Sequence, residues 1–199
     1  MQVKLVAPAD GLFVYHDRIL KIDCKNNELT HLPDLSECIL LETLICNNNR
    51  LVILPDLSNC KNLKSLICHT NKLISLPDLT ECHILKYINC DNNYLTYLPT
   101  ISTCTQLISL SCNNNRLFEL PDLSFCLHLK FLYFRNNHII HLPDLTHIYT
   151  LFNIMADTNY LHETYDWQKL PYPYCTLKAE YQRNVNYLLN KIHTTSVIY

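Results

Sequence analysis

Residues 41–62 read L-E-T-L-I-C-N-N-N-R-L-V-I-L-P-D-L-S-N-C-K-N, and residues 63–84 read L-K-S-L-I-C-H-T-N-K-L-I-S-L-P-D-L-T-E-C-H-I. Both follow one 22-residue unit, L-x-x-L-x-C-x-x-N-x-L-x-x-L-P-D-L-S-x-C-x-x. Further copies begin at Leu85, Leu107 and Leu129, and looser copies begin at Ile19 and Leu151. A short unit repeated at a fixed period is typical of a solenoid of stacked repeats.

Asparagine keeps the same spacing in every copy, at Asn27, Asn49, Asn71, Asn93, Asn115, Asn137 and Asn159. The first eleven positions of the unit match L-x-x-L-x-L-x-x-N-x-L, with cysteine at the third apolar position. They therefore resemble the leucine-rich repeat superfamily over residues 19–161. The Cys- and Asn-rich form also resembles the leucine-rich repeat proteins of giant DNA viruses of amoebae. The resemblance implies a horseshoe-shaped α/β solenoid that binds a protein.

Each L-x-x-L-x-C segment is predicted to form a short strand of a parallel sheet. In the copy that begins at Leu41, we expect Leu41, Leu44 and Cys46 to face the core, and Thr43 and Ile45 to face outward on the concave side. About eleven residues then join one strand to the next, which is short for a crossover helix. The convex side is therefore expected to consist of turns or short 3₁₀ pieces.

Two polar positions of the unit are predicted to shape the turns. The seven asparagines follow the strands, where they can bond backbone groups that have left the sheet, so we expect a buried asparagine ladder. In the L-P-D segment, Pro55 fixes φ and Asp56 can cap the following turn, and the other copies repeat this pair with one exception, Thr100.

The ends of the chain depart from the repeat. Residues 1–18 are predicted to be an N-terminal cap made from a degenerate half-repeat, residues 19–161 to form about seven repeats, and residues 162–199 to be a C-terminal cap. A helix is expected in that cap because apolar residues there follow helical spacing, at Tyr181, Val185, Leu188, Leu189 and Ile192. The same helix could instead dock on a partner.

Composition argues against several classes of protein. The 199 residues carry sixteen Lys and Arg against eighteen Asp and Glu, without the basic excess of a nucleic-acid-binding protein. No apolar run is long enough to span a membrane, and Met1 to Asp10 does not resemble a secretory signal. A single glycine argues against a phosphate-binding loop. We expect an intracellular protein that acts as a monomer.

The eleven cysteines do not form a metal-site pattern. Ten of them fall in two columns of the repeat and no C-x-x-C pair occurs. Phe134, Ala156 and Ile148 replace cysteine in those columns, so the positions need only be apolar. The cysteines are predicted to be buried thiols in a reducing compartment, which is the host cytoplasm if the protein is viral. We expect no metal and no cofactor, and interpret His138 and His141 as solvent-facing turn residues.

The concave face is the best candidate for function, because no catalytic motif is present and exposed aromatic residues on a rigid sheet are typical of protein-binding sites. We predict a non-catalytic interaction module that holds a protein partner on this face. The alternative is an adaptor whose C-terminal helix recruits a second protein, of ligase or phosphatase type. The predicted contact residues are Ile45, Ile67, Tyr87, Phe131, Tyr133, Arg135 and Met155.

Overall fold

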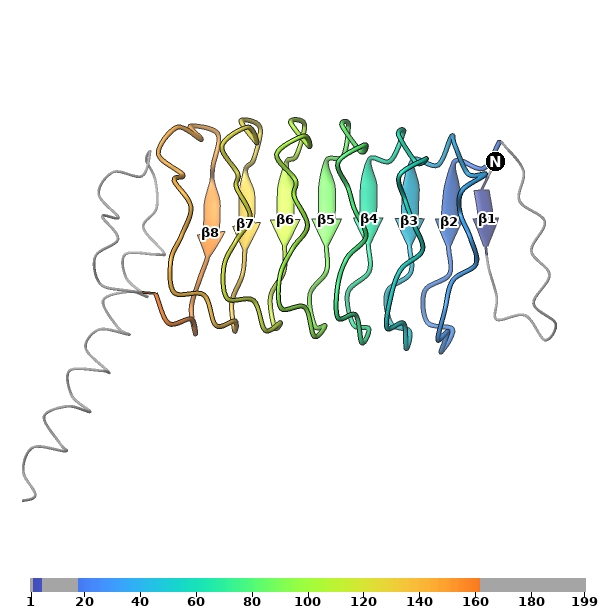
Figure 1. Cartoon of the computed structure of the whole chain (residues 1–199), viewed down its shortest axis with the longest axis horizontal. Coiled ribbons are helices and arrows are strands. Elements are labelled where there is room, and N and C mark those ends of the chain that lie inside the picture. The colour runs from blue at the N-terminus through green and yellow to red at the C-terminus, as the bar shows by residue number, and fades with distance from the viewer. Residues whose placement is uncertain (1, 5–17, 162–199) are drawn as a thin grey trace, which may run out of the picture.

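The computed structural model describes residues 2–4 and 18–161 of the chain. These residues form a row of short strands that stand side by side (Figure 1). The eight strands, each of three residues, are β1 (Gln2–Lys4), β2 (Lys21–Asp23), β3 (Thr43–Ile45), β4 (Ser65–Ile67), β5 (Tyr87–Asn89), β6 (Ser109–Ser111), β7 (Phe131–Tyr133) and β8 (Asn153–Met155).

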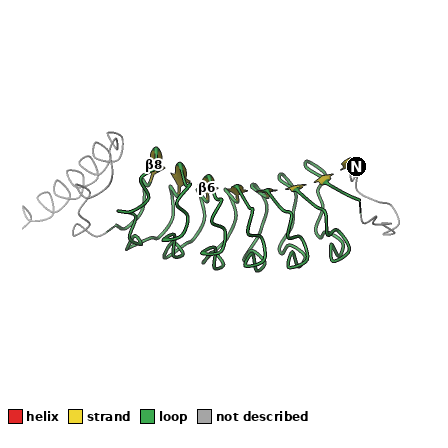
Figure 2. Ribbon diagram, turned by 90° about the horizontal axis from the view of Figure 1, so that it is seen from above, coloured by secondary structure: helices red, strands yellow, loops and turns green. Residues whose placement is uncertain are grey.

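All eight strands belong to one parallel sheet, in which they stand in the order of the sequence. From β2 to β8 the register advances by one repeat at each step, so that Leu44 pairs with Leu66 and Leu66 with Ile88. Each turn of the chain therefore adds one strand to the sheet. The strands line the concave side of a curved solenoid, and the loops lie on its outer side (Figure 2). The predicted parallel-sheet solenoid is confirmed.

The core is a single cluster that runs along the whole solenoid. Leu41, Leu44 and Cys46 are fully buried, and the equivalent positions of the other copies are also buried. The ten cysteines of the two columns are free and buried. Phe134 and Ala156 replace cysteine in the strand-side column and are buried as well. These positions thus select for apolar character and accept side chains of different size.

The convex side consists of turns, and residues 18–161 contain no α- or 3₁₀-helix. In one copy Cys60 N donates to Leu57 O at 2.9 Å, and Leu63 N donates to Cys60 O at 2.9 Å. These are two separate i→i+3 turns, whereas a 3₁₀-helix needs such bonds from successive residues. The predicted capping of the turn is present, because Ser58 N donates to Asp56 Oδ1 at 2.9 Å. That bond and the one from the Ser58 hydroxyl lower the pKa of Asp56.

The asparagines of the repeat join each copy to the one before it. Asn71 is buried, and its Nδ2 donates to Cys68 O of its own copy at 3.0 Å and to Cys46 O of the preceding copy at 2.9 Å. Its Oδ1 accepts a hydrogen bond from Leu51 N of the preceding copy at 3.0 Å. The amide therefore satisfies backbone groups that the end of the strand leaves without partners. Asn49, Asn93, Asn115 and Asn137 repeat this arrangement.

A second row of asparagines lies one position earlier. Asn48 has a φ of 55°, in the left-handed region, and the same conformation recurs in every copy at this position. Asparagine tolerates this conformation better than most residues, and five of the seven copies carry it here, whereas Thr70 and Thr158 occupy the position in the other two. Its side chains also stack, because Asn48 Nδ2 donates to Asn26 Oδ1 at 2.8 Å. The sequence analysis did not predict this row.

The two ends of the chain are only partly described. Strand β1 pairs in parallel with β2, with Gln2 opposite Lys21, so this first step is shorter than the 22-residue repeat. The predicted strands did not include it. The predicted C-terminal helix and most of the predicted N-terminal cap lie outside the described residues. Within the described part, no helix has the length and apolar character needed to cross a membrane.

Candidate protein-binding face

The outward side chains of β2 to β8 form the concave face. Among the predicted contact residues, Tyr87 is the most open, with 44% of its surface exposed, and the other six are half-buried. The sheet brings Ile45 beside Ile67. It also brings Tyr133 beside Met155. The predicted residues thus form two groups, with Ile45, Ile67 and Tyr87 in one and Phe131, Tyr133, Arg135 and Met155 in the other.

An aromatic cluster marks the second group. The ring of Phe131 lies 6.2 Å from that of Tyr133 and 6.1 Å from that of Phe152, the latter in an edge-on arrangement. Phe152 is 62% exposed and was not among the predicted contact residues. It directly precedes β8, at a position where other copies carry charged residues, such as Lys64, Lys86 and Lys130. A comparison of this column along the repeats would have identified it.

A shallow hollow of about 460 Å³ separates the two groups. It forms because β6 carries only small outward side chains, Ser109 and Ser111, whereas β5 and β7 carry tyrosines. Its lining residues are Ser65, Ile67, Tyr87, Ile88, Asn89, Asp91, Ser109, Ser111, Asn113 and Tyr133. The sequence analysis named three of them, Ile67, Tyr87 and Tyr133, as contact residues, but it did not predict a hollow, because a hollow depends on side-chain size across three strands.

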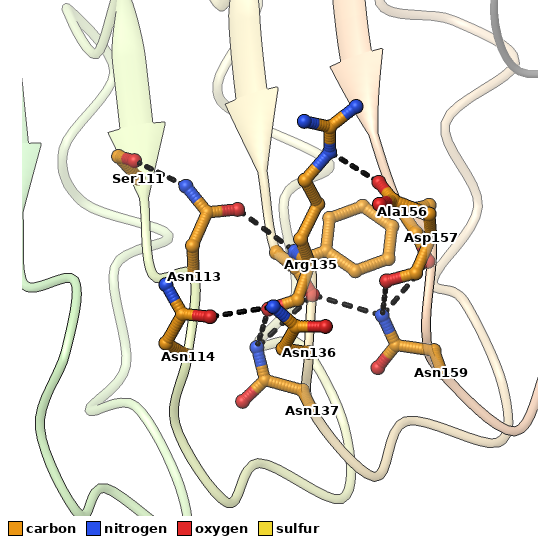
Figure 3. Close-up of polar contacts among 10 residues, drawn as sticks. Ser111, Asn113, Asn114, Arg135, Asn136, Asn137, Ala156, Asp157 and Asn159 are labelled. Carbon is orange, nitrogen blue, oxygen red and sulfur yellow. Dashed lines mark hydrogen bonds and ion pairs between the residues drawn. The ribbon is translucent and has the colours of Figure 1, made fainter.

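A chain of polar contacts crosses the C-terminal ends of the strands. Asn113 Nδ2 donates to the Ser111 hydroxyl at 3.1 Å, and Asn113 Oδ1 accepts a hydrogen bond from Arg135 N at 2.8 Å (Figure 3). The Arg135 guanidinium forms an ion pair with Asp157 of the next copy (Figure 3). Arg135 is therefore held within the face by an internal partner, and a protein ligand would contact it as part of this network.

The thiols are not placed for chemistry. Burial raises the pKa of Cys60 and of Cys82 to about 12 and that of Cys104 to about 11. A thiol is a nucleophile or a metal ligand only as the thiolate, so these groups are unreactive at neutral pH. In the described ranges 2–4 and 18–161, no three His, Cys, Asp or Glu residues are grouped so that they could hold a metal ion.

A second surface follows the edge where the asparagine turns lie. His138 is half-buried there, with its ring stacked on Tyr160 at 5.6 Å and tilted against Phe118 at 5.7 Å, whereas His141 is exposed. The interpretation of both as solvent-facing residues is therefore wrong for His138. Exposed apolar side chains continue along this edge, at Val52, Ile53, Ile74, Tyr94, Tyr97, Phe118, Ile140 and Tyr160. This row was not predicted, although a comparison of the same columns along the repeats would have shown it.

The architecture is similar to that of leucine-rich repeat proteins of known structure. The chain is similar to YopM of Yersinia pestis, a leucine-rich effector protein, with a TM-score of 0.66 and 35% identity over 73% of this chain. It is similar to InlJ of Listeria monocytogenes, whose functional domain includes a cysteine ladder, with a TM-score of 0.68 and 30% identity over 75% of this chain. A leucine-rich repeat protein of Leptospira interrogans gives a TM-score of 0.63 and 27% identity over 72% of this chain.

These neighbours share the 22-residue spacing and the parallel-sheet solenoid of this chain. The matched region spans 40% of the YopM structure, 38% of the Leptospira structure and 32% of the InlJ structure. No protein-family model matches the sequence, and no curated protein matches it. The neighbours suggest a protein–protein interaction module, and all three are bacterial, so the resemblance to viral repeat proteins stays a prediction.

Proposed function

We propose that the protein is a non-catalytic interaction module that holds a protein partner on the concave face of its solenoid. The observation that carries the proposal is the hollow between Tyr87 and Tyr133, flanked by the Phe131–Phe152 aromatic cluster. Aromatic side chains on a rigid surface, next to a depression, are the features that protein-binding sites share.

Three further observations support the proposal. The parallel sheet fixes the backbone of the face, so binding would order few groups and cost little conformational entropy. The structurally similar chains include an effector protein of Yersinia pestis and an effector leucine-rich repeat domain of Shigella. The free, buried cysteines suit a reducing compartment, and we propose that the protein works inside a cell.

The test is affinity capture with a variant that lacks the three aromatic contact side chains, Tyr87, Phe131 and Tyr133, each replaced by alanine. We expect a protein captured by the native chain, from a lysate of the source organism or its host, to bind this variant at least about 100-fold more weakly, because aromatic anchors commonly contribute about 2 kcal/mol each when truncated. The measurement is the dissociation constant of the captured protein for each chain.

The control replaces the same residue types elsewhere, with Tyr97, Phe125 and Tyr149 changed to alanine. These side chains are 55%, 60% and 79% exposed and lie outside the concave strands. We expect this variant to bind the partner as the native chain does. Equal binding by the concave variant, with its circular dichroism spectrum unchanged, would contradict the proposal and move the site to another surface.

A further inference from the structure

The hollow contains one charged group among its lining residues, the carboxylate of Asp91. This carboxylate accepts hydrogen bonds at Oδ1 from the Ser111 hydroxyl at 2.8 Å and from Asn113 N at 2.6 Å, and the same hydroxyl lies 3.0 Å from Oδ2. Both donors are neutral, so they orient the carboxylate and leave its negative charge in place. A carboxylate has about four acceptor positions, and these bonds leave acceptor capacity on Oδ2.

Other carboxylates on this face have a basic partner. Asp157 pairs with Arg135, Glu42 with Lys64, and Asp23 with Lys25. Within residues 18–161, Asp91 forms no ion pair. The equivalent positions of the adjacent copies carry His69 and Asn113, and neither forms an ion pair with Asp91. The carboxylate of the hollow therefore has no ion-pair partner among the described residues.

The aromatic walls of the hollow favour a cationic ligand, as its negatively charged carboxylate does. Tyr87 and Tyr133 line it diagonally from β5 and β7, two strand spacings apart and two residues apart along the strands, which places their Cα atoms about 12 Å from each other. That width admits one flat or slender side chain over the small residues of β6. A guanidinium group stacks on aromatic rings and donates two parallel hydrogen bonds to a carboxylate. An ammonium group is a compact charge that donates hydrogen bonds without this planar, two-bond geometry.

We propose that this hollow is a subsite for an arginine side chain of the protein partner, with Asp91 as its ion-pair acceptor and Tyr87 and Tyr133 as its walls. The inference rests on the proposed function, because it names the chemistry of the partner at that same face. Ser111 and Asn113 are positioning residues, since they hold the Asp91 carboxylate toward the hollow.

The test uses acetyl-arginine methylamide as the probe and its citrulline analogue as a neutral control of nearly the same shape. Each is titrated into the isotope-labelled full chain, and backbone amide shifts are followed by NMR. We expect saturable shifts at Asn89, Ser111 and Asn113 with a dissociation constant of about 1 mM, which is typical of a fragment of this size. Citrulline is expected to bind at least about fivefold more weakly.

Two variants that each remove one negative charge test whether arginine binding depends on Asp91. Asp91→Asn should weaken arginine binding at least about fivefold, to the level of citrulline. Asparagine is native at the equivalent positions 47 and 113, so this variant is expected to fold. Asp56→Asn, which removes one carboxylate from a convex turn, should bind arginine as the native chain does.

Each outcome bears on one claim. Equal shifts with citrulline, unchanged binding by Asp91→Asn, or no response at the three amides would each overturn the arginine subsite. If that happens while the captured partner is still lost with the concave triple variant, the proposed function stands and the subsite alone fails. If arginine binds as expected but the triple variant keeps the partner, the subsite stands as a cation-binding hollow and the proposed function fails.

Discussion

Replacing Asn71 with alanine is expected to lower the free energy of unfolding by about 2–4 kcal/mol. Asn71 is buried; its Oδ1 accepts a hydrogen bond from Leu51 N, and its Nδ2 donates to Cys46 O and Cys68 O. Alanine would leave Leu51 N without a partner, and a buried orphan costs about 1–3 kcal/mol. Cys46 O and Cys68 O would each lose one of two hydrogen bonds, since Asn49 and Asn93 also donate to them, and each lost bond costs about 0.5–1.5 kcal/mol. The affected groups belong to two adjacent copies, so the interface between those copies weakens as well.

Urea unfolding followed by circular dichroism measures this effect. The matched control is Asn59→Ala, because Asn59 is exposed and its side chain makes a single bond, from Nδ2 to Ser36 O at 3.2 Å. We expect a change within about 0.5 kcal/mol for the control. A loss below about 1 kcal/mol for Asn71→Ala would show that the asparagine row is not a main source of stability.

A second large effect is expected at alkaline pH, where the protein should lose most of its stability between pH 9 and pH 11. Burial raises the pKa of the Cys60 and Cys82 thiols from 9.0 to about 12. It also raises the pKa of the other cysteines in the two columns of the repeat. Below pH 9 the thiols are protonated in both states, so they add no pH dependence.

Above pH 9 the unfolded chain releases thiol protons while the folded chain keeps them. The unfolded state then binds fewer protons, and the free energy of unfolding falls as pH rises. At pH 10 each such thiol lowers it by about 1 kcal/mol, so several of the ten together approach the about 5–15 kcal/mol that stabilises a typical domain.

Urea unfolding at a series of pH values, in the presence of a reductant, measures this decline. A variant with Cys38, Cys60 and Cys82 replaced by alanine should show a shallower decline, because three titrating groups are gone. Its absolute stability at pH 7 is expected to be lower, so the comparison is between slopes. A native protein whose free energy of unfolding stays flat from pH 9 to pH 11 would show that the thiols ionise equally in both states.

Much of the fold follows from the 22-residue period. The inward positions of Leu41, Leu44 and Cys46, the outward positions of Thr43 and Ile45, and the parallel order of the strands depend only on alternation and repetition. The predicted 3₁₀ pieces are absent from residues 18–161, because the convex loops form separate turns instead of successive i→i+3 bonds. Strand β1 was not predicted, because its pairing with β2 does not keep the period.

The candidate site was predictable only in part. Tyr87 and Phe131 could be placed on the concave face, because a column position decides which way a side chain points. The hollow and the ion pair of Arg135 could not be predicted, because they depend on the sizes and charges of neighbours 22 residues away. Asp91 was not among the predicted contact residues, because its place in the hollow depends on contacts between copies, such as those with Ser111 and Asn113.

The most direct test of the central claim, that the concave face holds the partner, is site-specific photocrosslinking. A benzophenone amino acid is placed at Ser65, an outward residue of β4 at the edge of the hollow, and separately at Asn59 on an exposed convex turn. The account predicts that the captured partner forms a covalent adduct with the chain labelled at position 65 and none with the chain labelled at position 59. An adduct from position 59 alone would contradict it.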